Sequence, residues 1–212
     1  MTEPGGGLKE VQMFTGIVQA VGRIAAKVPS GSGVRLRIES EAIPWTQVKV
    51  GDSIAVSGVC LTVVEIDTDG FNTDLSPETL HRTTFHHAGV GTPVNLELAM
   101  TPTTRFGGHI VTGHVDGVAE VVARWDEGEV VHLSLRVPKE YAKYLAPKGS
   151  IALDGVSLTV SRVDGEEFEV VLIPHTLATT TLGRKEVGDQ LNFEVDIIAR
   201  YLERLLAQRG TG

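Results

Sequence analysis

Cysteine is nearly absent from this sequence, since Cys60 is the only one among 212 residues. A single cysteine forms neither an internal disulfide nor a cysteine-based zinc site. Aromatic residues make up only 5% of the chain and the formal net charge is −8, so the stacking platforms and the basic stripe of a nucleic-acid-binding protein are missing too. No apolar run reaches the length of a membrane span, and no charged-then-apolar leader opens the chain. These absences predict a soluble cytoplasmic protein that binds neither nucleic acid nor membrane.

What the chain does contain is one stretch that occurs twice. Residues 53–63 return as residues 150–160 with few changes, at a spacing of 97 residues (62 to 159). The same spacing holds from residue 15 to residue 97, without an insertion. It pairs Thr15 with Thr112, Val34 with Val131, Leu36 with Leu133, Pro77 with Pro174, Asn95 with Asn192, and Glu97 with Glu194. This period is too long for a solenoid unit and about right for a small domain, so the chain is predicted to be a tandem duplication.

The pattern within each half is that of short strands. Alternating or β-branched runs in the first half predict strands over 16–24, 34–38, 53–66, 71–75 and 94–98. Gly58 is expected to form a bulge or a tight bend, and Pro77 suits the first position of a short helical turn. About six short strands per half, separated by Gly-rich turns, favour a small closed antiparallel barrel in each half.

The two ends of the chain break this pattern. Residues 1–12 include a Pro-Gly-Gly-Gly run and are expected to form a flexible extension, with Met13 left open as an alternative start. Asp196 is expected to cap a helix that places Ile198, Tyr201, Leu202 and Leu205 on one face. That helix either packs on its own barrel or forms an oligomer contact. The predicted division is an extension over 1–12, barrels over 13–109 and 110–195, and a helical end over 196–212.

Candidate chemistry is sought where the two copies differ, because matched positions carry the common fold. Cys60 matches Ser157 and is read either as a small buried apolar residue or as a polarizable group lining a pocket. His114 lies in a Gly-rich connection and is either structural or an acid–base group that titrates near neutrality. Its spacing from His109 fits no standard metal site, and no phosphate loop or nucleophile elbow is present. The residues alone predict a twin-barrel binder with two unequal pockets.

Several motifs taken together resemble the riboflavin synthase family. They are residues 13–18, 58–63, 107–114, 154–160 and 172–177, and the similarity extends from residue 13 to about residue 206. The resemblance implies an all-β fold of two tandem six-stranded antiparallel Greek-key barrels with a C-terminal helix, assembled as a homotrimer. It implies a dismutation of two 6,7-dimethyl-8-ribityllumazine molecules by four-carbon transfer, which gives riboflavin and 5-amino-6-(ribitylamino)uracil. It implies no metal and no organic cofactor, and an active site between the N-terminal barrel of one subunit and the C-terminal barrel of its neighbour.

The resemblance also assigns individual residues of this chain to the active site, position by position. Positions associated with activity are Phe14, Thr15, Ser53, Cys60, His109, His114 and Asp196, together with Lys148. One lumazine is expected to meet Gly16, Ile17, Val18, Cys60, Leu61, Thr62, Asp74, Leu75, Ser76, Pro77, Glu78 and Thr79. The other is expected to meet Gly113, His114, Val115, Lys148, Ser157, Leu158, Thr159, Val171, Leu172, Ile173, Pro174, His175 and Thr176.

Two departures and one rival accompany this expectation. Many family members have a second cysteine where this chain has Val59, and the family usually begins at the position of Met13. The rival is a non-catalytic relative, a lumazine- or flavin-binding antenna protein of the same duplicated fold. Retention of Cys60, Ser53 and His114 favours the enzyme. Association with lumazine synthase is left open.

Overall fold

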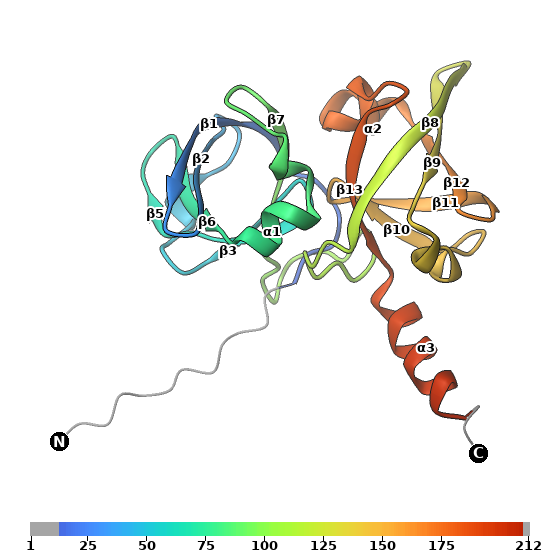
Figure 1. Ribbon diagram of the computed structural model, residues 1–212. Coiled ribbons are helices and arrows are strands. Elements are labelled where there is room, and N and C mark those ends of the chain that lie inside the picture. The colour runs from blue at the N-terminus through green and yellow to red at the C-terminus, as the bar shows by residue number, and fades with distance from the viewer. Residues whose placement is uncertain (1–12, 210–212) are drawn as a thin grey trace.

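The computed structural model describes residues 13–209, which form two β-barrels side by side and one C-terminal helix (Figure 1). The predicted extension over 1–12 lies outside the described residues. The first barrel contains β1 (Ala20–Ser30), β2 (Gly33–Glu39), η1 (Trp45–Gln47), β3 (Ser53–Val56), β4 (Val59–Thr62), β5 (Glu65–Ile66), β6 (Gly70–Leu75), α1 (Pro77–Arg82), η2 (Thr84–His86) and β7 (Pro93–Leu98). The second contains β8 (Gly117–Glu127), β9 (Val130–Arg136), η3 (Lys139–Tyr144), β10 (Ser150–Leu153), β11 (Val156–Asp164), β12 (Glu167–Leu172), α2 (Pro174–Thr179), η4 (Thr181–Arg184) and β13 (Gln190–Val195).

The second barrel closes completely, in the strand order β10-β11-β12-β9-β8-β13. The first has the matching order β4-β3-β7-β1-β2-β6-β5. Its outermost strands, β4 and β5, are consecutive in the chain, with only Val63 and Val64 between them, and Val64 N donates to Asn72 O at 2.9 Å. At the matching place β11 has a bulge between Val160 and Arg162 instead of a break. The predicted pair of antiparallel barrel-like domains is thus confirmed, but only the second is a closed barrel. The first is a seven-stranded sheet that stays open between β4 and β5, where one strand is split in two.

Two expectations about strands were wrong in detail. The strand predicted over 16–24 begins at Ala20, because the residues before it leave their own barrel. The strand predicted over 53–66 is three strands, and the turn after Val56 consists of Ser57 and Gly58, both with positive φ (42° and 81°). Two successive residues with positive φ give the tight hairpin turn whose twist matches that of antiparallel strands.

The strand alternation accounts for the cores. In the β3–β4 hairpin, Ile54, Val56 and Leu61 point into the first barrel and are buried, whereas Ser53 and Thr62 pair on the opposite face. The hairpin of β10 and β11 repeats this arrangement, with Ser150 opposite Thr159. Each barrel therefore fills its interior with its own apolar side chains and presents its polar hairpin positions outward.

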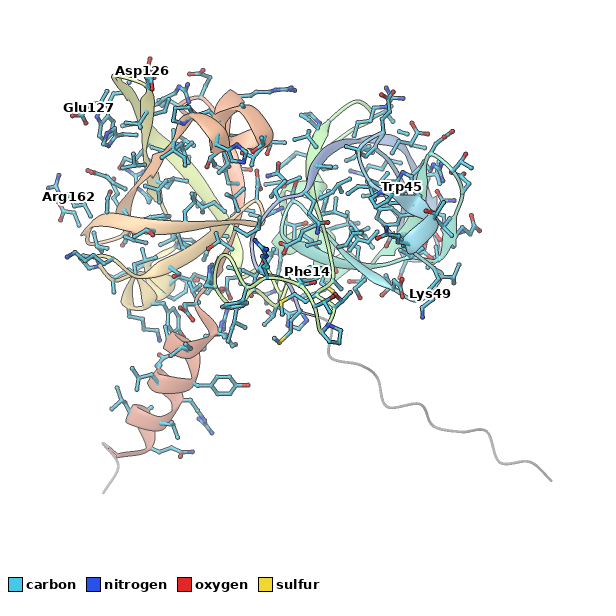
Figure 2. All side chains as sticks on the ribbon, turned by 180° about the vertical axis from the view of Figure 1, so that it is seen from behind. Phe14, Trp45, Lys49, Asp126, Glu127 and Arg162 are labelled. Atoms are coloured by element: carbon cyan, nitrogen blue, oxygen red, sulfur yellow. The ribbon has the colours of Figure 1, made fainter. Side chains whose placement is uncertain are left out.

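The two barrels meet across an approximate twofold axis. Phe14 N donates to Val111 O at 2.8 Å and Val111 N donates to Phe14 O at 3.1 Å, which pairs two residues that match in the duplication. Phe14 is fully buried between the barrels (Figure 2). The two hairpin turns also touch, since a Cβ on Gly58 would lie 2.8 Å from Gly155 N. Residues that match in the duplication thus contact each other at the interface between the two barrels, which we call the seam.

The C-terminal helix α3 (Ile197–Arg209) leaves the second barrel and extends away from both (Figure 1). Asp196 Oδ1 accepts from Ile198 N at 2.9 Å, as expected of a cap. Arg200 pairs with buried Asp116, and Glu203 contacts Lys143 and Tyr144. The face formed by Ile198, Tyr201, Leu202, Leu205 and Leu206 is exposed. No helix among residues 13–209 is long and apolar enough to span a membrane.

Candidate functional site

Each barrel sends the segment before its first strand onto the other barrel. Glu97 accepts hydrogen bonds from Thr15 N (2.7 Å), Thr15 Oγ1 (2.8 Å) and Gly16 N (3.0 Å). This turns the Gly16 carbonyl towards the second barrel, where it accepts from Ser157 N at 2.7 Å. Gly16 has φ +75°, and a Cβ there would lie 2.6 Å from Ser157 Cβ, so glycine is needed for the approach. Val18 packs against the second core.

The second half does the same in reverse. Glu194 accepts from Thr112 N and Oγ1, both at 2.7 Å, and from Gly113 N at 2.9 Å. Gly113 O then accepts from Cys60 N at 2.9 Å, and Val115 packs against the first core. Burial raises the pKa of the Glu194 carboxyl, and the three hydrogen bonds oppose that rise. The buried carboxylates hold the crossed segments in place.

This crossing corrects the expected grouping of site residues. Gly16, Ile17 and Val18 were grouped with Cys60, but they lie against the barrel that carries Ser157. The residues grouped with Ser157, namely Gly113, His114 and Val115, follow the chain onto the barrel that carries Cys60. The reason is the twofold seam, which neither spacing nor strand pattern reveals.

The first-barrel half-site is built on the β3–β4 hairpin. Cys60 pairs with Ala55 in the register, and its half-buried side chain is on the same face as Ser53 and Thr62. Burial raises the pKa of the Cys60 thiol, while a hydrogen bond with Ser53 opposes the rise. The group is therefore a neutral thiol at pH 7, able to polarise a ligand but not poised as a thiolate. The side chain of Leu61, another residue predicted to bind substrate, points into the core.

The end of β6 and the segment after it add a fixed polar edge to this half-site. Asp74 receives a bidentate pair of hydrogen bonds from Arg35, both at 2.8 Å, and these lower the pKa of its carboxyl. Ser76 caps α1 by accepting from Thr79 N at 3.1 Å, and Pro77 occupies the first turn as predicted. Glu78 is exposed, whereas Leu75 points into the core.

His114 belongs to the same half-site through its neighbour Gly113. Its backbone N donates to Thr112 Oγ1 at 3.3 Å, and its side chain is exposed. It lines a cavity of about 380 Å³ together with Arg82, Tyr141 and Arg200. The exposed imidazole thus follows directly on Gly113, which touches Cys60, but the cavity that it lines does not include Cys60.

The second-barrel half-site contains a hydroxyl–imidazole pair. His109 Nδ1 lies 2.7 Å from Ser157 Oγ, and His109 is buried, with 8% of its surface exposed. Its Nε2 has no hydrogen-bond partner among the residues that the structure describes. Burial holds the pKa of His109 below its usual value, and the charge of Asp196 opposes this. A neutral imidazole bonded to a hydroxyl can accept or relay a proton.

The remaining expected residues also belong to the second barrel. Thr159 is exposed on the same face of the β10–β11 hairpin as Ser157, and Leu158 packs against the second core. Ile173 and His175 are exposed at the start of α2, with Pro174 in its first turn and Thr176 half-buried. Lys148 has φ +68° in an exposed loop. In this segment Leu172 is buried in the core, and Val171 pairs with His132 in the register.

Sequence reasoning missed the polar residues that set this geometry. Glu97 and Glu194, and the neighbouring Asn95 and Asn192, are buried in the last strand of each barrel and bond to crossing segments or to the other barrel. A signal was available, because amide and carboxyl side chains that recur at equal spacing in an apolar strand are costly unless they are satisfied.

Comparison with known proteins agrees with this architecture. The lumazine binding domain family matches the chain twice, over residues 15–99 and 112–196. The riboflavin synthase of Photobacterium phosphoreum is 51% identical over 92% of this chain and 89% of that protein. The riboflavin synthase of Brucella abortus is 46% identical, covering 91% and 98% respectively.

A solved structure with another name also matches. LumP complexed with 6,7-dimethyl-8-(1'-D-ribityl) lumazine superimposes with a TM-score of 0.78 and 29% identity, over 86% of this chain and 99% of that chain. Its identity is well below that of the synthases, which favours the enzyme over the antenna alternative. With two lumazine binding domains and about half of its residues identical to one synthase, the chain belongs to the riboflavin synthase family.

Proposed function

We propose that this chain catalyses the dismutation of two 6,7-dimethyl-8-ribityllumazine molecules to riboflavin and 5-amino-6-(ribitylamino)uracil. The observation that carries the proposal is the pair of matched but unlike half-sites. One presents a thiol and an exposed histidine, Cys60 and His114, and the other a hydroxyl bonded to a buried histidine, Ser157 and His109. Two identical substrates with different duties call for such a pair.

The reaction needs no external oxidant or reductant. One lumazine gives its four-carbon unit, the two ring carbons with their methyl groups, to the other, so all atoms of the two products come from the two substrates. The C7 methyl of a lumazine must lose a proton, and the lumazine ring accepts the resulting electron pair. The protein is then asked mainly to hold the two rings in register and to move protons.

The crossed segments support an assignment of residues to each of the two ligands. The first-barrel lumazine is proposed to meet Cys60, Thr62 and Thr79 together with residues 113–115. The second is proposed to meet Ser157, Thr159 and Thr176 together with residues 16–18. Thr62 and Thr159 would hydrogen-bond the heterocycles. His114 would assist proton transfer at the first site and the Ser157–His109 pair at the second, while Cys60 and Ser53 polarise the ring.

The proposed assembly is a cytoplasmic homotrimer in which the N-terminal barrel of one subunit faces the C-terminal barrel of another. Its support is the exposed apolar face of α3, namely Ile198, Tyr201, Leu202, Leu205 and Leu206. A helix with such a face at the end of a chain favours self-association.

The test is incubation of the purified chain with 6,7-dimethyl-8-ribityllumazine and no additive, following riboflavin absorbance. We expect riboflavin at half the molar amount of lumazine consumed. Tight lumazine binding without riboflavin would contradict the proposal and place the chain with the antenna proteins.

A further inference from the structure

Asn95 connects the two barrels although it belongs to the first. It lies in β7 and is buried, with 1% of its surface exposed. Its Nδ2 donates to Asp154 O at 2.8 Å, and its Oδ1 accepts from Thr181 N at 2.8 Å. Both partners belong to the second barrel. Asp154 forms the β10–β11 turn, and Thr181 is the first residue of η4.

Asn192 makes the reciprocal connection from the second barrel to the first. Its Nδ2 donates to Ser57 O at 2.8 Å, and its Oδ1 accepts from Thr84 N at 2.8 Å. Ser57 forms the β3–β4 turn, and Thr84 begins η2. The two asparagines match in the duplication. The asparagine of each barrel thus forms hydrogen bonds with one hairpin turn and one 3-10 helix of the other barrel.

The turns and 3-10 helices that the asparagines bond are next in the chain to residues of the candidate site. Next to Thr84, Thr83 Oγ1 donates to Thr79 O at 2.7 Å, and Thr79 is the proposed ligand-binding residue of α1. Next to Thr181, Thr180 Oγ1 donates to Thr176 O at 2.7 Å in α2. The held turns precede the strands that carry Cys60 and Ser157. Each asparagine therefore fixes two walls of the half-site on the opposite barrel.

We infer that Asn192 is a positioning residue for the first-barrel half-site and that Asn95 is one for the second-barrel half-site. The functional part of this inference rests on the proposed lumazine chemistry. A side-chain amide offers both a donor and an acceptor at this length, whereas an ionised carboxylate of the same length offers acceptors only. Its removal leaves a buried N–H and a buried carbonyl without partners on the opposite barrel. Hydrogen bonds at the interface between the two barrels thus position both half-sites.

Hydrogen–deuterium exchange of the full chain tests the positioning independently of any ligand. With Asn192→Ala we expect amides in residues 77–88 to exchange at least about tenfold faster, while those in 174–185 keep their wild-type rates. Asn95→Ala is expected to do the opposite. Asn72→Ala removes an amide that bonds Glu65 within the first barrel (2.6 Å) and is the matched control, with neither segment affected.

A general loosening, in which either variant accelerates both segments equally, would overturn the inference. If an alanine variant does not fold, Asn192→Asp replaces it, because the introduced carboxyl keeps the acceptor for Thr84 N and loses only the donor to Ser57 O. The β3–β4 turn and β4, residues 57–62, must then respond, because Ser57 O loses its donor; exchange unchanged in these residues would also overturn the inference.

Ligand binding supplies the functional readout. In a Thr159→Trp background, which fills the second-barrel half-site, Asn192→Ala is expected to weaken lumazine binding about tenfold and Asn95→Ala less than about twofold. Equal losses would contradict site-selective positioning. If the wild-type chain binds no lumazine at all, the proposed function fails, and the exchange pattern still decides the positioning.

Discussion

At the scale of single residues, the two proposed half-sites differ in the side chain at one matched position, Cys60 in the first and Ser157 in the second. Cys60 presents a sulfur whose pKa is raised by burial, and Ser157 presents a hydroxyl bonded to His109 at 2.7 Å. A neutral thiol and an imidazole-bound hydroxyl differ in basicity and in the direction of proton flow. The two copies thus share the hairpin backbone but differ in the group that can give or take a proton.

His109→Gln should lower turnover about a hundredfold, because a glutamine keeps a hydrogen bond to Ser157 but cannot accept the proton. The measurement is kcat with 6,7-dimethyl-8-ribityllumazine, with the melting temperature as a control for folding. Wild-type kcat in a folded variant would remove His109 from proton transfer.

The acidic limb of the pH–rate profile should lie below the ordinary histidine pKa of about 6.5, because burial lowers the pKa of His109. The lowered pKa of His109 also makes the free energy of unfolding fall at acidic pH. The stability that depends on neutral His109 is complete above pH 6.5 and is lost as the pH falls through the folded pKa. Unfolding measured between pH 8 and pH 5 should show this loss, and the His109→Gln chain should show less of it.

Cys60 should react slowly with iodoacetamide at pH 7, since burial keeps its thiol protonated. The midpoint of the rate against pH should lie above that of free cysteine. Ser53→Ala should raise it further by removing the opposing hydrogen bond. A midpoint below the free-cysteine value would mean that Cys60 is an activated thiolate.

At the scale of elements, the hairpin turns decide how the barrels meet. Gly58 has φ +81°, and a Cβ there would lie 2.8 Å from Gly155 N, whereas Gly31 has φ +57° and nothing within 4 Å. Both positions strain an alanine, but only the first also pushes the barrels apart.

Gly58→Ala should therefore destabilise the chain by about 2–4 kcal/mol, and Gly31→Ala by only about 1 kcal/mol. Chemical denaturation of both variants gives the comparison. Equal losses would show that backbone strain alone matters and that the seam adapts to the extra methyl group.

Much at this scale could be predicted from the sequence. The alternation in residues 34–38 and 94–98 and the exact spacing of 97 residues were enough for two barrels, because a strand with one buried face must repeat every second residue. The crossing of residues 14–18 could not be predicted. It depends on the contact of Gly16 with Ser157 and of Gly58 with Gly155, and such close approaches between distant segments leave no local pattern.

At the scale of the whole molecule, α3 is tied to the second barrel by Arg200 and Glu203 and leaves its apolar face uncovered. Leu202→Glu should convert the proposed trimer into monomers, because a carboxylate would be buried in the contact. Light scattering measures the mass, with exposed Arg204→Glu, which changes charge without removing an apolar contact, as the control. A trimer that persists in Leu202→Glu would place the subunit contact elsewhere.

The most direct test of the central claim, that two lumazines react with each other, uses an equal mixture of unlabelled lumazine and lumazine carrying carbon-13 throughout its four-carbon unit. Dismutation predicts that half of the riboflavin carries the label in one four-carbon unit, a quarter in both and a quarter in neither. Riboflavin that carries the label in one unit at most would contradict the account, because the second unit would then come from another source.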